Sequence, residues 1–108
     1  MASAEKFIST LEKAVEEYAA TNWPDFKEAA ETDARTFVAD WADSLTTWVD
    51  LVIEGKLSVD DFHSLVGGKI DLAELRCLKD AGLVVYQWDH FKSGLVGVIV
   101  HTAVTYFL

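Results

Sequence analysis

The sequence predicts an all-α fold, a four-helix up-and-down bundle of two long helices, one short helix and a long fourth helix with a candidate break at Gly82. Three observations support this prediction. Apolar residues recur every three or four positions along most of the chain, which is typical of amphipathic helices. No pair of segments alternates apolar and polar residues as two paired strands would. With 108 residues, the chain has the size of one domain spanning 1–108.

The first long helix is predicted over residues 3–21. Its apolar face is formed by residues at helical spacing, namely Phe7, Leu11, Ala14 and Tyr18. The Asn-Trp-Pro segment at 22–24 then breaks the helix. Proline disfavours helical geometry in the residue before it and fits the first turn of a following helix.

The second long helix is predicted over residues 24–54, with Gly55 as its C-terminal cap. One continuous apolar face runs along it, formed by Ala30, Ala34, Phe37, Trp41, Leu45, Trp48 and Val52. The tryptophans are predicted to lie in the core.

The short third helix is predicted to begin at Ser58, whose hydroxyl fits an N-terminal cap, and to end at Gly67-Gly68. The fourth helical region is predicted to begin at Asp71. Its buried face is expected to comprise Leu72, Leu75 and Leu78, then Val84, Trp88, Phe91, Leu95, Val98 and Thr102.

The end of the chain, residues 93–108, is very apolar, and no full charge follows Lys92. As a helix this segment is about 24 Å long, whereas a bilayer core is roughly 30 Å thick, which argues against a membrane span. We expect a core helix whose surplus apolar surface also closes a homo-oligomer, with a dimer favoured. A ligand pocket wall and a membrane-inserting tail are the alternatives. The expected core or oligomer contacts are Gly94, Gly97, Val98 and His101.

The chain carries a net charge of −9, and most of the excess acid lies in residues 1–54. This balance excludes nucleic acid as an expected partner, since phosphate binding requires basic residues. An acidic row follows one side of the second helix, formed by Asp33, Asp40, Asp43, Asp50 and Glu54. The row is either a docking face for a basic protein or simply a solvated face.

Side chains with catalytic potential do not form a recognisable motif, so we expect no enzymatic activity and no cofactor. The single cysteine, Cys77, excludes an internal disulfide and is expected to be an inert thiol. Asp60 and His63 have the spacing of a metal-binding pair, and His101 is a third candidate, but neither completes a ligand set. We expect His101 to be a core histidine and the protein to hold no metal.

Residues 54–108 resemble the C-terminal half of a group of short, uncharacterised bacterial proteins. The matching segments are 54–58, 60–62, 68–69, 71–75, 78–83 and 94–108. The resemblance covers about half of the chain and implies a recurring bacterial helical module with no catalytic role. The first ten residues lack the basic and apolar regions of a signal peptide, so a cytoplasmic location is expected.

These observations together favour a non-catalytic, self-associating structural or protein-interaction module. One alternative is a carrier that holds an apolar small molecule between the aromatic second helix and the C-terminal helix. Another is an acidic inhibitor or immunity-type partner of a basic protein.

Overall fold

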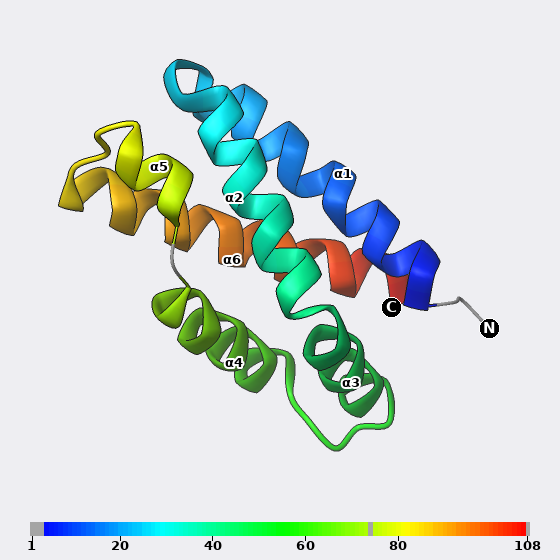
Figure 1. The fold of residues 1–108 in the computed structure, drawn as a ribbon. Coiled ribbons are helices and arrows are strands. Elements are labelled where there is room, and N and C mark those ends of the chain that lie inside the picture. Colours follow the sequence, from blue (N-terminus) through cyan, green and yellow to red (C-terminus); the bar gives the residue numbers. More distant parts are fainter. Residues whose placement is uncertain (1–3, 74, 108) are drawn as a thin grey trace.

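The computed structural model describes residues 4–73 and 75–107, and these residues are almost entirely helical (Figure 1). The elements are α1 (Ala4–Asn22), the 3-10 turn η1 (Pro24–Phe26), α2 (Lys27–Asp40), α3 (Ala42–Ile53), α4 (Val59–Leu72), α5 (Arg76–Asp80) and α6 (Val85–Phe107). The predicted all-helical class is confirmed, with no strand in the described parts of the chain. Six α-helices replace the predicted four because the chain breaks at more points than the sequence pattern shows.

The first helix and its break are confirmed, but the predicted apolar face is only partly right, because Ala14 and Tyr18 are half-buried. α1 buries one apolar stripe, which comprises Phe7, Leu11, Val15 and Ala19. Pro24 then begins η1, as its fixed backbone geometry favours. Residue 3, the predicted start of α1, lies outside the described residues.

The predicted continuous helix over 24–54 is wrong, because Trp41 separates α2 from α3. Trp41 has φ −110° and ψ 15°, outside regular helical geometry, although its N–H still donates to the Phe37 carbonyl at 3.1 Å. The change of direction lets α2 pack on α1 and α5, while α3 packs on α4. The apolar spacing continues through the bend, so periodicity alone does not reveal it.

The predicted boundary at Gly67-Gly68 is also wrong. α4 begins with the predicted cap, in which the Ser58 hydroxyl accepts a hydrogen bond from the Asp61 N–H at 3.0 Å. The helix then continues through both glycines, because buried Val66 and Ile70 hold it against the core. The region predicted to begin a new helix at residue 71 is the end of α4.

Two glycines end helical segments by adopting left-handed backbone geometry. Gly55 has φ +76° after α3, and Gly82 has φ +92° after α5. Side chains other than glycine rarely adopt this geometry, so both positions favour the residue present. The candidate break at Gly82 is therefore a true break, and α6 begins only at Val85.

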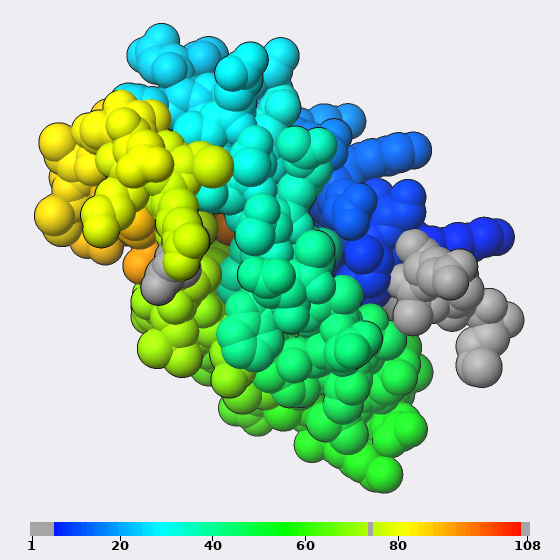
Figure 2. All heavy atoms as spheres, in the orientation of Figure 1, coloured from blue at the N-terminus to red at the C-terminus, as the bar shows by residue number. Residues whose placement is uncertain are grey.

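The core lies around α6, which packs against α1 on one side and α4 on the other. α1 and α2 run side by side, and α6 crosses behind them in Figure 1. The space-filling view in Figure 2 shows α5 pressed directly against α2, with most of α6 hidden behind these elements. Within the described residues, none of the helices combines the length and the apolar character that crossing a bilayer requires.

Candidate functional site

The apolar C-terminal segment is covered by its own chain over the residues that the structure describes. Buried side chains from this segment are Leu95, Val96, Ile99, Val100 and Ala103. Of the four predicted contact residues, Val98 is half-buried and Gly94 packs on α1, whereas Gly97 and His101 are exposed. The expectation of a core histidine at 101 is wrong, because this residue lies on the side of α6 away from α1 and α4. Leu108 lies outside the described residues.

Gly94 marks a close approach between α6 and α1. A β-carbon at this position would collide with the hydroxyl and ring of Tyr18. The Tyr18 hydroxyl donates to the Phe91 carbonyl at 3.1 Å and accepts from the Trp23 indole N–H at 2.9 Å. Burial raises the pKa of the Tyr18 phenol, and the hydrogen bond from Trp23 opposes this shift without reversing it. Tyr18 thus ties the end of α1 to α6.

A groove of about 740 Å³ opens beside this contact, and we call it the corner groove. One wall comes from the end of α1 and the residue that follows it, and the other from the first three turns of α6. The lining residues are Tyr18, Asn22, Trp23, Tyr86, Gln87, Asp89, His90, Ser93 and Gly94. Because Gly94 has no side chain, Tyr18 packs directly against α6 beside the groove.

Aromatic rings form a connected series along the corner groove. The Trp23 ring meets Phe91 edge-on at 5.8 Å and His90 edge-on at 6.5 Å between centroids. His90 in turn contacts the ring of Tyr86 at 5.5 Å. Phe91 is buried beneath the series, whereas Tyr86 and His90 are exposed. The rings therefore present aromatic surface to the outside of the molecule.

Three consecutive large apolar residues at the start of α6 remain in contact with water beside this groove. Val84, Val85 and Tyr86 are 59%, 77% and 73% exposed. Single exposed apolar residues are common on protein surfaces, but a contiguous apolar patch marks a candidate contact site. We call these three residues the apolar rim.

Asp89 is the one residue with a full charge among those that line the corner groove. Its carboxylate makes no hydrogen bond or ion pair with any residue the structure describes. Two of the polar neighbours are already engaged. The Asn22 amide donates to the Tyr18 carbonyl at 3.2 Å, and the Gln87 side-chain oxygen accepts from the Val84 N–H at 3.2 Å.

Asp33 does not belong to the exposed acidic row that the sequence predicts. It is only 5% exposed, and its two carboxylate oxygens accept hydrogen bonds from the N–H groups of Cys77 at 3.2 Å and Leu78 at 2.7 Å. These N–H groups belong to the first turn of α5, which has no cap from its own segment. Asp33 therefore caps α5 from a distant helix, a structural role that the sequence pattern does not show.

The other four members of the acidic row, Asp40, Asp43, Asp50 and Glu54, are exposed along α2, α3 and the residue that follows. Glu54 forms an exposed ion pair with Lys56 at 3.3 Å. Asp60 and His63 are also exposed on α4, and the described residues contain no group of three or more metal-binding side chains.

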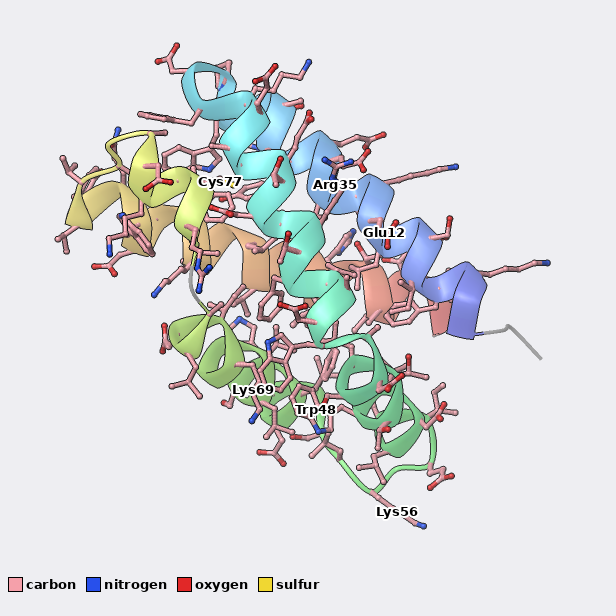
Figure 3. All side chains as sticks on the ribbon, in the orientation of Figure 1. Glu12, Arg35, Trp48, Lys56, Lys69 and Cys77 are labelled. Carbon is pink, nitrogen blue, oxygen red and sulfur yellow. The ribbon has the colours of Figure 1, made fainter. Side chains whose placement is uncertain are left out.

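Cys77 faces α2 from α5 (Figure 3) and lines a second groove of about 640 Å³ together with Asp33, Asp40 and Trp41. Burial, followed by the negative charge of Asp33, raises the pKa of the Cys77 thiol. A nucleophilic cysteine requires the opposite shift, since the thiolate is the reactive form. This groove therefore lacks an activated thiol.

The carrier hypothesis requires a cavity between the aromatic second helix and the C-terminal helix. Three grooves formed by described residues lie at α2 with the end of α4 and the start of α5, at the corner of α1 and α6, and between α4 and α6, and none of these three lies between the second helix and α6. Compared with protein-family models, curated proteins and solved structures, the chain matches none of them. The function is therefore inferred from the geometry and charge of the surface.

Sequence reasoning missed the corner groove because its walls are more than sixty residues apart in the chain. No motif in the sequence links Trp23 to Tyr86, and only the packing of α1 on α6 brings them into one groove. At the apolar rim the prediction was wrong, because Val84 was expected on the buried face of the fourth helix and is 59% exposed. The run Leu83-Val84-Val85-Tyr86 follows Gly82 with no polar residue, and a helix start of this kind exposes apolar side chains unless another element covers them.

Proposed function

We propose that this protein is a non-catalytic interaction module that docks a basic and partly apolar segment of another protein at the corner groove. The observation that carries the proposal is that one groove holds aromatic rings and an unpaired carboxylate, while exposed Val84 and Val85 precede its lining residue Tyr86 in the chain. Apolar and aromatic residues supply most of the binding energy at protein interfaces. Asp89 adds a preference for positive charge.

The charge of the whole molecule supports the same class of partner. A chain of net charge −9 attracts a basic segment from a distance and repels acidic ones. The exposed acids of α2 and α3 contribute to this field without forming a binding site of their own. The proposal refines the basic-partner alternative and replaces self-association as the leading function, because α6 is covered by α1 and α4.

Selection from a random peptide library tests the proposal. We expect the protein to enrich peptides that combine a large apolar residue with arginine or lysine, and the binding to weaken as salt concentration rises. The double variant Val85→Ser with Tyr86→Ser should lose the binding, since both changes remove rim side chains that the fold does not bury.

The matched control is the double variant Ile53→Ser with Val59→Ser, which removes two exposed apolar residues from the α3–α4 region. It should bind the selected peptides as the native chain does. No common sequence among the selected peptides, or equal binding to the rim variant, would contradict the proposed function.

Self-association through the same rim is the second candidate, because a second copy offers its own Val84 and Val85 as an apolar occupant. Two chains of charge −9 repel each other, so this association should strengthen with salt, whereas binding of a basic segment should weaken. Sedimentation at low and high salt distinguishes the two, and a monomer under both conditions removes this candidate.

A further inference from the structure

We infer that the corner groove holds the guanidinium group of a partner's arginine side chain, stacked on the rings of Trp23 and Tyr86 with Asp89 as its counter-charge. The inference rests on the proposed function and names the chemical group that the groove recognises. Two features carry it: aromatic rings that line the groove, with Tyr86 largely exposed, and an unpaired carboxylate in the same lining.

The rings provide the stacking surface. Tyr86 is largely exposed, and the half-buried ring of Trp23 lines the same groove, where it contacts His90 and Phe91 edge-on. Aromatic faces carry partial negative charge and attract cations, most strongly for tryptophan. A planar guanidinium can lie flat on such a face, which a tetrahedral ammonium cannot do.

Lysine side chains of the chain itself already make this type of contact elsewhere. The Lys69 ammonium lies 4.8 Å from the centre of the Trp41 ring, and that of Lys92 lies 5.4 Å from the Trp88 ring. Figure 3 shows Lys69 on the side of α4 that faces α3. Neither of these two contacts involves Trp23 or Tyr86, so neither lysine competes for the rings that line the groove.

Asp89 supplies the second half of the recognition. Its carboxylate lies on the α6 wall of the groove and has no partner among the described residues. A guanidinium offers several N–H donors in one plane, so it can stack on a ring and donate to a carboxylate at the same time. Asp89 is also the one lining residue with a full negative charge, so it is the strongest acceptor that the groove offers a guanidinium.

Three tripeptides test the inference, each with two leucines around a central arginine, lysine or citrulline. Citrulline has the shape of arginine without its charge. In calorimetric or NMR titrations of the full chain, we expect the arginine peptide to bind about five- to ten-fold more tightly than the citrulline peptide, and more tightly than the lysine peptide. Tyr86→Leu, which keeps apolar area but removes the ring, should reduce that ratio about three-fold.

Asp89→Asn should remove most of the remaining preference, while Asp60→Asn, a change at an exposed acid on α4, should leave the ratio intact. Equal binding of the arginine and citrulline peptides overturns the arginine site but leaves the proposed function standing if the library still selects rim-dependent peptides. Failure of all three tripeptides to bind at millimolar concentration also overturns the site. Loss of rim dependence in the library overturns the proposed function itself.

Discussion

The two ends of α6 differ in a way that hydropathy does not predict. Its C-terminal part is the most apolar segment of the chain, yet Leu95 and Ile99 are completely buried by α1 and α4. Its first turn is less apolar overall, yet Val85 and Tyr86 are more than 70% exposed. The start of α6 extends past the end of α4 at the edge of the molecule (Figure 1). An apolar segment therefore points to a binding surface only where no neighbouring element covers it.

The difference in burial between the two ends of α6 determines which end can serve as a binding surface. The expected oligomer interface on residues 93–108 required apolar side chains that reach the solvent, and the exposed positions there include Gly97 and His101 instead. The surface that does expose large apolar groups is the rim beside the corner groove. The candidate partner surface therefore lies at the beginning of α6 and not at its end.

We expect the greatest loss of stability from a substitution in the buried C-terminal part of α6. Leu95→Ala should lower the free energy of unfolding by about 3 kcal/mol, because it leaves a cavity in a fully buried site. Val85→Ala at the exposed end should change it by less than about 0.5 kcal/mol. Urea denaturation measures the free energy of unfolding of both variants. Similar losses in the two variants would contradict the burial of Leu95 and the exposure of Val85.

A smaller effect is expected from the buried acid of α2. Asp33→Ala removes both acceptors that cap α5 and should cost about 1–3 kcal/mol, whereas Asp40→Ala on the exposed row should be near neutral. Asp33→Asn keeps one acceptor oxygen and should recover part of the loss. If Asp33→Ala unfolds at the same urea concentration as Asp40→Ala, the cap does not stabilise α5.

The two glycines of α6 are expected to respond in opposite directions to the same substitution by alanine. Gly94→Ala should destabilise the protein by about 1–2 kcal/mol, since the new methyl group displaces the Tyr18 hydroxyl from its two hydrogen bonds. Gly97→Ala meets open space and should stabilise it by about 0.5–1 kcal/mol through higher helix propensity. Thermal unfolding measures both, and a destabilising Gly97→Ala would indicate a close neighbour at that face.

The smallest expected effect is a pH dependence at Cys77. Because the pKa of its thiol is raised in the folded state, that state holds the proton more tightly than the unfolded chain does. The stability from this group is complete below the ordinary thiol pKa of about 8.5 and declines as the pH rises above it. Tyr18 adds a decline of the same sign nearer its ordinary pKa of about 10.

Cys77→Ala should therefore lose less stability than the native chain between pH 7.5 and pH 9.5. Urea midpoints at the two pH values provide the measurement, with Tyr18 unchanged in both proteins. An identical decline in the native chain and the variant would show that Cys77 does not contribute.

Much of the local structure followed from residues close together in the chain. The helical period predicted α1, Pro24 predicted its end, Ser58 predicted the cap of α4, and Gly82 marked a break. The candidate site was predicted less well. The acidic row gave four exposed acids correctly, but it also included Asp33, whose partners lie 44 and 45 residues away.

The helical class, the net charge and the positions where backbone geometry favours proline or glycine can all be predicted from the sequence. These properties depend on each residue and its nearest neighbours, through helical periodicity, capping and backbone sterics. The bend at Trp41, the burial of Asp33 and the exposure of the apolar rim depend on how distant helices pack, so they became visible only in the folded structure. Whether a side chain is buried depends on which distant helix packs over it, and that packing depends on interactions along the whole chain.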